Sequence, residues 1–269
     1  MTPKRFRDHV LGWYEKDGRT HLPWRKSRDP YRILVSEIML QQTQVERVIP
    51  FYDAFLEAFP DVSALASAPL SRVLQKWQGL GYNRRAKMLH GAAKAVVREY
   101  EGKIPKDIAK LESLPGIGHY TARAVAAFAW NQDVVFVETN LRTAVMHHFF
   151  PNEEKVRDAE VLAILEKALP EGEARRWYAA LMDYGSYLKR TGVRINAKSA
   201  TYAKQPTFRG SGREARGAIL RALAKKPEKQ AYLAGILGPD RKEQVAEQLK
   251  KLFKEGLIEK VRGIYRLPS

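Results

Sequence analysis

The sequence predicts a mostly α-helical protein in which a helical core precedes a small α+β domain. Two patterns predict this architecture. Over residues 1–188, apolar side chains recur at helical spacing in short segments that end at glycine or proline. Over residues 213–269, three short helical segments precede two extended runs that flank Arg262-Gly263. We therefore expect two domains, joined by a basic linker at residues 189–212.

The composition favours a polyanion as the partner. Lys and Arg number 47 against 30 Asp and Glu, so the formal net charge is +17 and the pI is about 9.9. Solubility does not require so large an excess. Nucleic acid is the natural partner of such a surface, and the alternative is a basic surface that serves solubility alone. A hydrophobic content of 45% in 269 residues suffices for two modest domains.

The sequence contains no cysteine. Its absence excludes disulfides, thiolate catalysis and any zinc or iron–sulfur centre held by cysteine. We expect no metal at His147 and His148 either, because adjacent histidines point to different faces of a helix. Residues 1–30 have no apolar h-region, and no run approaches about 20 apolar residues, so we expect a cytoplasmic protein without a membrane span.

The N-terminal part is expected to hold two helices. An apolar stripe from Phe6 to Tyr14 predicts the first, and Leu22-Pro23-Trp24-Arg25 ends it. Asp29-Pro30 is typical of a helix start, with the aspartate as N-cap and proline in the first turn. We expect this second helix to run as far as Pro50.

Glu37 is a candidate general acid inside the second helix. Its neighbours three and four positions away include Ile33, Leu34 and Leu40, with Gln41 the polar exception. The carboxyl group therefore projects from a largely apolar face, where burial raises its pKa toward the range useful to a general acid. The alternative is a carboxylate paired with one of the many arginines.

A second candidate is the loop Gly79-Leu80-Gly81-Tyr82-Asn83-Arg84-Arg85. It lies among helices expected at residues 52–59, 64–68, 70–77 and 86–100. Two glycines, an aromatic ring and two arginines suit a loop that presses Tyr82 into a base stack while Arg84 and Arg85 hold phosphates. The alternative is a helix C-cap with a packed tyrosine.

The stretch Leu114-Pro115-Gly116-Ile117-Gly118-His119-Tyr120 predicts a hairpin between two helices. A short helix at 108–114 precedes it, and a helix at 121–130 with five alanines follows it. The backbone amides at Gly116 and Gly118 can approach an anion at the helix start, plausibly a DNA phosphate. The alternative is an ordinary turn between two packed helices.

Glu138 is the second candidate carboxylate. It follows a short extended piece at 134–137 and precedes a helix that is expected to begin at Thr139 or Asn140. At a helix N-terminus the dipole and the free amides favour the charged form. The sequence thus offers one carboxyl group expected to be protonated, Glu37, and one expected to be ionised, as acid and base roles require. The alternative for Glu138 is an ordinary acidic helix start.

The C-terminal part is expected to be a winged helix-turn-helix. Helices at 156–169 and 174–188 complete the core, and residues 189–212 are basic and lack a helical pattern. Beyond them, three helices and a hairpin with a turn at Arg262-Gly263 form the predicted second domain. Such a domain most often reads DNA, and a protein-contact module is the alternative.

Together these residues resemble the helix-hairpin-helix DNA glycosylases, and among them the MutY-type adenine glycosylases. The resemblance covers residues 20–188. Its carriers are Leu22-Pro23-Trp24-Arg25, Ser36-Glu37-Ile38-Met39-Leu40-Gln41-Gln42-Thr43-Gln44-Val45, Gly79-Leu80-Gly81-Tyr82, the hairpin with Tyr120-Thr121-Ala122, Asn140, and Met182-Asp183-Tyr184-Gly185.

The resemblance implies a two-lobed helical core with the active site between the lobes. Lobe A would hold residues 22–133, and lobe B residues 1–21 with 134–188. In this family the acid at Glu37 protonates the departing adenine and later helps to activate water, and the carboxylate at 138 stabilises the sugar cation. Tyr120 occupies the position at which related lyases carry a lysine nucleophile, so the resemblance implies a monofunctional glycosylase.

The resemblance also assigns the remaining site residues. Asn140 joins the catalytic group, and Trp24, Arg25 and Gln41 form the base pocket. Gln42 and Tyr82 match residues that wedge into the duplex. The other residues expected to contact DNA are Leu80, Gly81, Arg84, Leu114, Gly116, Gly118 and His119.

The chain departs from the family pattern at four places. Glu138 replaces an aspartate and is one methylene longer. The cluster cysteines are replaced, by spacing, by Lys189, Asn196, Ser199 and Gln205, so no iron–sulfur cluster or other cofactor is expected. Tyr178-Ala179 stands where the family usually has an amide or acid that touches adenine. A winged helix replaces the domain that reads 8-oxoguanine.

The sequence therefore predicts a base excision repair glycosylase that removes adenine mispaired with guanine or 8-oxoguanine. Its partner would be mismatched or damaged duplex DNA, and it would act as a monomer in a prokaryotic nucleoid. Two alternatives stay open: a glycosylase that removes thymine or uracil opposite guanine, and a non-catalytic DNA-binding protein built on the same scaffold.

Overall fold

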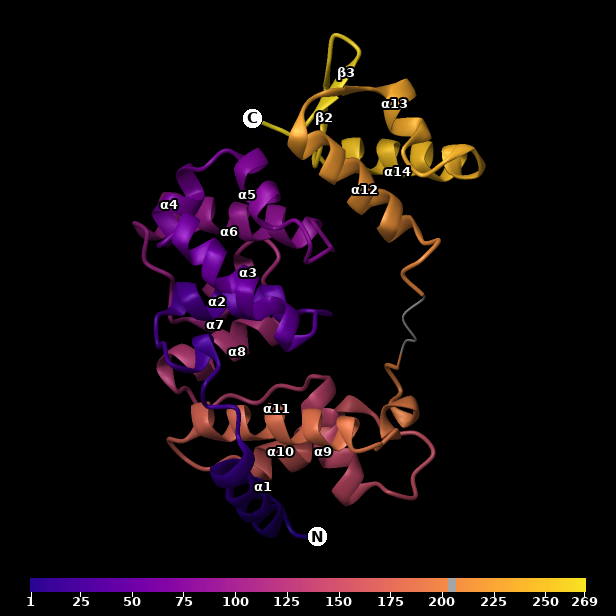
Figure 1. The fold of residues 1–269 in the computed structure, drawn as a ribbon. Helices are drawn as coiled ribbons and strands as arrows, with labels where there is room; N and C mark the ends of the chain where they lie inside the picture. Colours follow the sequence, from indigo (N-terminus) through magenta and orange to yellow (C-terminus); the bar gives the residue numbers. More distant parts are fainter. Residues whose placement is uncertain (203–206) are drawn as a thin grey trace. The chain divides into compact units, whose positions relative to one another are not determined.

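The computed structural model describes residues 1–202 and 207–269 (Figure 1). The structure is mostly helical, as predicted, with one small sheet. The helices and strands are α1 (Pro3–Asp17), η1 (Pro23–Arg25), α2 (Pro30–Leu40), α3 (Val45–Ala58), α4 (Val62–Ser67), α5 (Leu70–Lys76), α6 (Arg84–Tyr100), α7 (Ile108–Ser113), α8 (His119–Trp130), α9 (Thr139–Phe149), α10 (Asp158–Ala168), α11 (Ala174–Arg190), η2 (Ile195–Lys198), α12 (Gly212–Lys225), β1 (Glu228–Lys229), α13 (Gln230–Gly235), η3 (Pro239–Arg241), α14 (Lys242–Lys254), β2 (Glu259–Val261) and β3 (Ile264–Arg266).

The chain divides into two compact units, and the division differs from the predicted one. Unit 1 holds Met1–Glu37, Pro105–Ser113 and Ile117–Lys204, and unit 2 holds Ile38–Ile104, Leu114–Gly116 and Gln205–Ser269. Helix α8 therefore belongs with the part predicted as lobe B, because α8 packs against α11. The predicted second domain at 213–269 belongs to unit 2, because α12 packs against α5 there.

In unit 1, α1, α9, α10 and α11 lie side by side (Figure 1). Phe6 of α1 and Trp177 of α11 are fully buried, and their rings meet edge to face with centroids 5.8 Å apart. Helices α9 and α11 pack closely at Gly185, where an added Cβ atom would lie 2.0 Å from the carbonyl oxygen of Asn140. A glycine is required at this contact.

The expected single helix from Asp29 to Pro50 is wrong at its C-terminal end. Its start is as predicted, since the Asp29 side chain accepts a hydrogen bond from the Tyr31 amide at 2.9 Å. However, α2 ends at Leu40, and a second helix, α3, begins at Val45 and includes Pro50. Gln42 has φ of 54° in the intervening loop, a left-handed conformation that ends a helix.

The hairpin between α7 and α8 forms as predicted. Gly116 has φ of 76°, and a Cβ atom there would lie 2.4 Å from Cβ of Met88, so only glycine fits. Gly118 is the N-cap of α8, with extended backbone. The five alanines of α8 are all buried, which lets this helix pack closely on its neighbours.

The predicted linker at 189–212 is wrong over its first part. Helix α11 continues to Arg190, and residues 191–202 fold back onto unit 1 through η2. Val156 donates to the Lys198 carbonyl and accepts from the Ala200 amide, both at 2.9 Å, so a short parallel bridge fixes this segment. Pro206 and Gln205 lie outside the described residues.

The C-terminal winged helix forms as predicted. Helices α12, α13 and α14 precede the β2–β3 hairpin, whose turn residues Arg262 and Gly263 have φ of 49° and 83°. The structure adds a short strand, β1, that pairs with β3, so the strand order is β1-β3-β2. In the described part of the chain, no helix is long and apolar enough to span a bilayer.

Candidate active site

Glu37 and Tyr120 form the centre of the candidate active site in unit 1. Glu37 is 5% exposed, and its Oε2 accepts a hydrogen bond of 2.7 Å from the Tyr120 hydroxyl. Burial raises the pKa of Glu37 to about 7, against the opposing effects of the Tyr120 hydrogen bond and of the Arg25 charge. The predicted burial of Glu37 and the direction of its pKa are confirmed, and its role as an acid stays a prediction. Within the described residues, the hydrogen bond to Glu37 comes from a tyrosine and no arginine forms a salt bridge with it.

Tyr120 is itself held by burial and by aromatic packing. Its ring meets Phe136 edge to face at 5.6 Å, and Phe136 stacks on Tyr178 at 4.0 Å. Burial and the neighbouring carboxylates of Glu37 and Glu138 raise the pKa of Tyr120 well above its usual value. Tyr120 therefore stays a neutral hydrogen-bond donor at physiological pH.

Glu138 is the N-cap of α9, as predicted. Its carboxylate accepts hydrogen bonds from the amides of Asn140 at 2.6 Å and Leu141 at 2.9 Å. The two amides and the charges of Lys189 and Arg142 lower the pKa of Glu138, as expected of a helix N-terminus. Burial raises that pKa by more, so the net direction is opposite to the expected one. The pKa values of both carboxyl groups are therefore raised.

Asn140 has a buried polar atom without a hydrogen-bond donor among the described residues. This atom is Oδ1, while Nδ2 lies 3.4 Å from Oε2 of Glu138. A buried acceptor left without a donor costs free energy unless a ligand or water satisfies it. Asn140 thus lies beside Glu138, and its membership of the catalytic group stays a prediction.

Arg25 connects the base-pocket segment to the rest of unit 1. Its Nη2 lies 3.6 Å from Oδ1 of buried Asp183, which also accepts from Arg19 at 2.7 Å. The Arg25 guanidinium lies over the Phe128 ring at 5.1 Å, and its charge lowers the pKa of Glu37. These ion pairs give Asp183 a structural role. The motif Met182-Asp183-Tyr184-Gly185 had supported the family resemblance, but its aspartate had no predicted role.

The other residues predicted to lie at the base pocket have separate surroundings in the structure. Trp24 is buried in η1, and Ala179 presents its carbonyl to Arg25 at 3.4 Å. Tyr178 donates to the Val134 carbonyl at 2.6 Å, so its hydroxyl is engaged by the backbone. Gln41 belongs to unit 2, where it lines a separate pocket.

The histidines of unit 1 have structural contacts. His9 and His148 each place Nε2 against the Tyr184 hydroxyl, at 3.0 and 2.7 Å. Burial lowers the pKa of His148 to about 4, so this ring stays neutral. Within the described residues, no group of three or more His, Asp or Glu side chains has the arrangement of a metal site.

The positions that replace the cluster cysteines carry polar contacts. Asn196 Oδ1 accepts from the Thr143 hydroxyl at 3.0 Å, and Ser199 Oγ lies 3.1 Å from Oγ1 of Thr201. Lys189 contributes a positive charge that lowers the pKa of Glu138. Hydrogen bonds thus hold the segment that follows α11, a role that composition alone did not predict.

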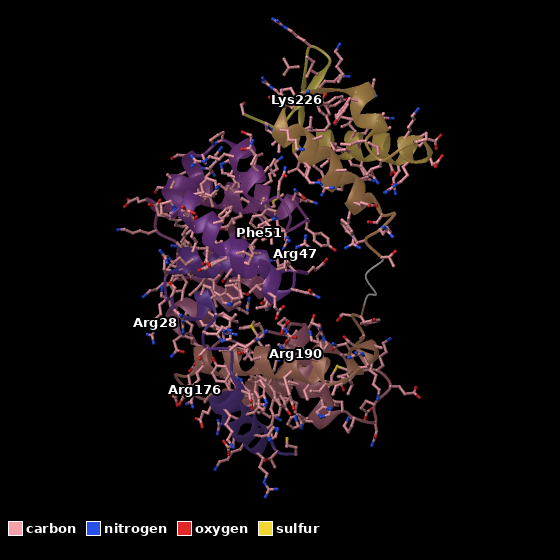
Figure 2. All side chains as sticks on the ribbon, viewed as in Figure 1. Arg28, Arg47, Phe51, Arg176, Arg190 and Lys226 are labelled. Atoms are coloured by element: carbon pink, nitrogen blue, oxygen red, sulfur yellow. The ribbon has the colours of Figure 1, made fainter. Side chains whose placement is uncertain are left out.

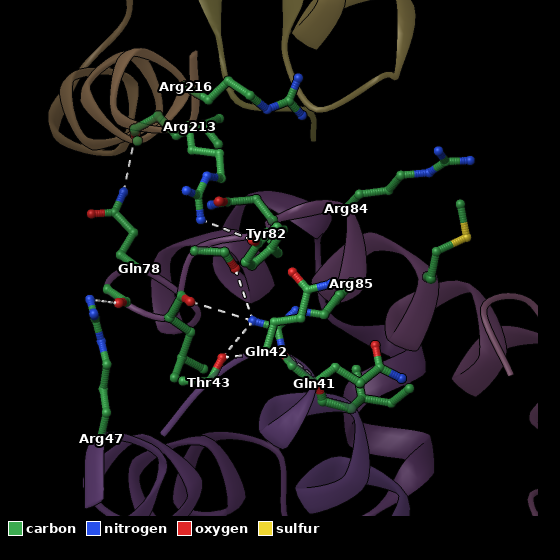
Figure 3. Close-up of a pocket in the computed structure, with 18 of the residues that line it drawn as sticks. Gln41, Gln42, Thr43, Arg47, Gln78, Tyr82, Arg84, Arg85, Arg213 and Arg216 are labelled. Atoms are coloured by element: carbon green, nitrogen blue, oxygen red, sulfur yellow. Dashed lines mark hydrogen bonds between the residues drawn. The ribbon is translucent and has the colours of Figure 1, made fainter. Parts of the chain in front are cut away.

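A pocket of about 1090 Å³ in unit 2 collects most of the residues predicted to contact DNA (Figure 3). Tyr82 has φ of 46° there, so its backbone is in the left-handed region, as is that of Gln42. Non-glycine residues rarely adopt this conformation. Such strain is typical of functional loops. The predicted lining residues are Gln41, Gln42, Leu80, Gly81, Tyr82, Arg84 and Gly116.

Arg85 does not hold phosphate as expected. Its guanidinium points inward and donates to the carbonyls of Ile38 at 2.7 Å and Met39 at 2.9 Å, and to Thr43 Oγ1 at 3.1 Å (Figure 3). It also reaches the carbonyl of Gly81 at 3.3 Å. Arg85 therefore ties together the two loops that carry Gln42 and Tyr82, a role that the sequence pattern did not reveal.

The remaining residues predicted to contact DNA differ in the exposure of their side chains. Leu80 and Leu114 are buried, so their side chains pack in the core and only their backbone is available to DNA. His119 in the first turn of α8 is exposed, and its Nδ1 lies 2.8 Å from Nη1 of Arg123. Gly118 is followed directly by the free amides of α8.

A model of the HhH-GPD superfamily base excision DNA repair proteins matches residues 35–171, which include Glu37, the hairpin and Glu138. The chain belongs to this superfamily. The geometry agrees with the match, since the residues matched hold both carboxyl groups and Tyr120.

Curated relatives of this superfamily are similar over most of the chain. The adenine DNA glycosylase of Mycolicibacterium smegmatis is 36% identical over 93% of this chain and 91% of its own length. The adenine DNA glycosylase of Mycobacterium tuberculosis is 42% identical over 68% of this chain and 62% of its own length. The adenine DNA glycosylase of Buchnera aphidicola subsp. Baizongia pistaciae is 34% identical over 70% of this chain and 54% of its own length.

Solved structures of HhH-GPD members share the fold. A thermostable thymine-DNA glycosylase is 27% identical with a TM-score of 0.64, covering 74% of this chain and 96% of that one. A non-covalent endonuclease III–DNA complex is 21% identical with a TM-score of 0.58, covering 70% and 87%. The expected helix-hairpin-helix fold is confirmed.

Proposed function

We propose that this protein is a monofunctional adenine DNA glycosylase of base excision repair. The observation that carries the proposal is the buried Glu37 carboxyl group, with a pKa raised to about 7 and a hydrogen bond from Tyr120. A general acid works best when its pKa lies near the operating pH. The similarity to adenine glycosylases over most of the chain supports adenine as the base.

The proposed reaction needs one proton donor and one stabilising carboxylate. Glu37 donates its proton to the purine ring of an extruded adenine, and the bond between C1′ and the base nitrogen then breaks with its electron pair going to adenine. Glu138 faces the cationic sugar. The Glu37 carboxylate next takes a proton from water as the water oxygen bonds to C1′, which restores the acid. The unsatisfied Oδ1 of Asn140 suits that water as a hydrogen-bond acceptor.

The absence of a lysine at position 120 supports hydrolysis without strand cleavage. Tyr120 is a neutral donor engaged with Glu37, so it offers no amine for a covalent sugar adduct. The proposed partner is duplex DNA with adenine opposite guanine or 8-oxoguanine, bound by a monomer. We also propose that no cofactor takes part, since the chain has no cysteine to hold a cluster.

A second candidate function is removal of thymine from a mispair with guanine. The similarity to a thymine-DNA glycosylase at 27% identity favours it. The Tyr178-Ala179 positions also offer no free side-chain amide or acid to adenine, since the Tyr178 hydroxyl is bonded to the Val134 carbonyl. Uracil opposite guanine belongs to the same alternative.

The test is single-turnover base excision on labelled duplexes that carry A opposite G, A opposite 8-oxoguanine, T opposite G, or U opposite G, followed by alkali. We expect alkali-dependent cleavage at A alone, and a loss of about 10²–10⁴-fold in rate for Glu37→Gln. Glu57→Gln, on the exposed face of α3, is the matched control and should keep the wild-type rate.

Three other outcomes would change the proposal. Cleavage at T or U with none at A would establish the second candidate. Cleavage at A that survives Glu37→Gln would remove Glu37 from the acid role. No cleavage in the wild type, with activity restored by Glu138→Asp, would mean that the longer side chain at 138 has silenced the site, because small misplacements of a catalytic group cost about 100-fold.

A further inference from the structure

The pocket of unit 2 has two walls of different origin. One wall is made by the loops that carry Gln42 and Tyr82, which the family resemblance assigns to DNA. The other wall is helix α12 of the winged helix, from which Arg213 points toward Tyr82 (Figure 3), while Arg216 pairs with Glu255. Helix α12 lies outside residues 35–171, which the superfamily model matches, and no residue of α12 carries the motifs of the resemblance.

The winged helix is fixed at this position by hydrogen bonds to its backbone. Four donors from residues 71–87 reach carbonyl oxygens of the winged helix: Gln75 Nε2 to Ala224 at 3.3 Å, Gln78 Nε2 to Leu220 at 3.0 Å, the Ser71 amide to Pro268 at 3.0 Å, and Lys87 Nζ to Glu255. Because backbone carbonyls are set by the fold itself, these bonds fix where α12 lies against the Tyr82 loop.

The pocket is strongly basic. Among its described lining residues, Glu255 is the one acid, and Arg216 holds both of its oxygens at 2.9 and 2.6 Å. The arginines that line it are Arg47, Arg84, Arg85, Arg213, Arg216 and Arg221. Arg85 is occupied by backbone carbonyls, so the charges that face the opening come from both walls.

Two of these arginines lack a partner within the described residues. Arg84 and Arg221 are exposed, and neither has a carboxylate or a hydrogen-bond acceptor within reach in the described part of the chain. Phe208, 57% exposed, adds an apolar surface next to Arg213, whose guanidinium lies 6.0 Å from its ring centroid. Exposed guanidinium groups around aromatic rings are typical of surfaces that bind nucleic acid.

Arg213 connects α12 to the predicted wedge residue. Its Nη1 donates to the Tyr82 hydroxyl at 2.9 Å, and its guanidinium lies 5.6 Å from the centre of the Tyr82 ring. A phenol oxygen is a neutral acceptor, whereas a phosphate oxygen is charged and can form an ion pair with the guanidinium, often through two parallel hydrogen bonds. A DNA strand that draws Tyr82 into its base stack would therefore give Arg213 a better acceptor in return.

We infer that α12 is part of the DNA-binding surface, and that Arg213 and Arg221 bind backbone phosphates of the duplex beside Tyr82, together with Arg84 of the facing wall. This inference rests on the proposed function, since it takes duplex DNA as the substrate. It assigns the winged helix a role distinct from the usual one, in which the last helix of the motif, here α14, reads the DNA.

The test measures duplex binding as a function of salt, using the full chain and a duplex with a stable abasic-site analogue opposite guanine. Each phosphate contact contributes about 0.9 to the slope of log K against log salt. We expect Arg221→Gln to reduce the slope by about 0.9 and the pair Arg213→Gln/Arg221→Gln by about 1.8. Between 50 and 200 mM salt, the binding constant of the wild type would then fall by a factor about ten times larger than that of the double variant.

The matched control removes two exposed charges from the opposite candidate surface, Lys250 of α14 and Arg262 of the hairpin turn. Lys250→Gln/Arg262→Gln should keep the wild-type slope. A wild-type slope in the α12 variants, or a reduced slope in the control pair alone, would overturn the inference. Arg221 is exposed on the helix surface, so its variant tests the inference even if Arg213→Gln perturbs the Tyr82 loop.

A parallel excision assay separates this inference from the proposed function. If the wild type excises no base while the α12 variants still reduce the slope, the glycosylase proposal fails and the binding surface stands. If excision proceeds and the slopes are unchanged, the glycosylase proposal stands and the inference about α12 fails.

Discussion

Unit 1 and unit 2 each hold a functional region, and the two regions treat charge in opposite ways. In unit 1, Glu37 is buried with a neutral tyrosine as its partner, and burial raises its pKa to about 7. In unit 2, exposed Arg84 and Arg221 keep their charge in contact with solvent. Under the proposed function, burial suits the site at which a proton is exchanged, and exposure suits the surface that attracts a polyanion.

Arg85 is the exception within unit 2, and it gives the largest expected effect. Its guanidinium is buried among carbonyls rather than exposed, and burial lowers its pKa to about 10. Arg85→Met leaves those carbonyls without a donor, so we expect a loss of roughly 3 kcal/mol in the free energy of unfolding. Urea denaturation measures it.

The neighbouring Arg84 provides the control for Arg85. It is exposed in the same helical turn, and Arg84→Met should change the free energy of unfolding by no more than about 0.5 kcal/mol. Equal stability of the two variants would contradict the view that Arg85 ties the Gln42 and Tyr82 loops together.

The second prediction concerns the stability cost of Glu37. Its pKa is about 7 in the folded protein and 4.5 in the unfolded chain, so the folded state binds more protons between these values. Stability associated with Glu37 is therefore fully present below pH 4.5 and is lost as the pH rises through 7. Glu37→Gln should stabilise the protein by roughly 3 kcal/mol at pH 8 and by little at pH 4.5.

Thermal melting of the wild type and Glu37→Gln at pH 4.5 and pH 8 tests the direction of this change in stability. The surface variant Glu57→Gln controls for the removal of one negative charge and should give no such difference. A Glu37→Gln variant that is less stable than the wild type at pH 8 would show that the carboxylate is satisfied in the folded state, and the comparison between buried and exposed charge would fail.

The secondary structure of both regions could be predicted well from the sequence. The apolar neighbours of Glu37 indicated its burial, and the position before α9 indicated that Glu138 is an N-cap. The pKa direction of Glu138 could not be predicted, because desolvation depends on tertiary packing that no local pattern records. The helix amides were visible in the sequence, whereas the burial that outweighs them was not.

The end of α2 was missed for a related reason. Pro50 suggested a helix end, but it lies inside α3, and at the break the Gln41 carbonyl accepts a hydrogen bond from Arg85, more than 40 residues away. The contact of Arg213 with Tyr82 was likewise beyond prediction, since no motif in either segment refers to the other. Contacts between distant segments set both features.

The third prediction examines the Tyr120 hydrogen bond. This bond lowers the pKa of Glu37, so Tyr120→Phe should raise the pKa of Glu37 further and move the alkaline limb of the excision rate to higher pH. Tyr178→Phe is the matched control, because it removes a buried hydroxyl bonded to the Val134 carbonyl and leaves Glu37 untouched. The pH dependence of single-turnover excision distinguishes them, and an equal displacement in both variants would indicate a general packing effect.

The smallest expected effect concerns Lys189, which stands where the family has a cluster cysteine. Its positive charge lowers the pKa of Glu138 and so favours the ionised form, which the proposed mechanism places against the sugar cation. Lys189→Met should raise the pKa of Glu138 and slow excision at neutral pH by roughly threefold, the magnitude of a partly screened charge interaction. Adjacent Arg190 is exposed (Figure 2), and Arg190→Met should leave the rate unchanged when excision is measured with saturating protein. A rate that falls equally in both variants would mean that these charges act on DNA binding, as the arginines of unit 2 do, and the distinction between the two regions would not extend to Glu138.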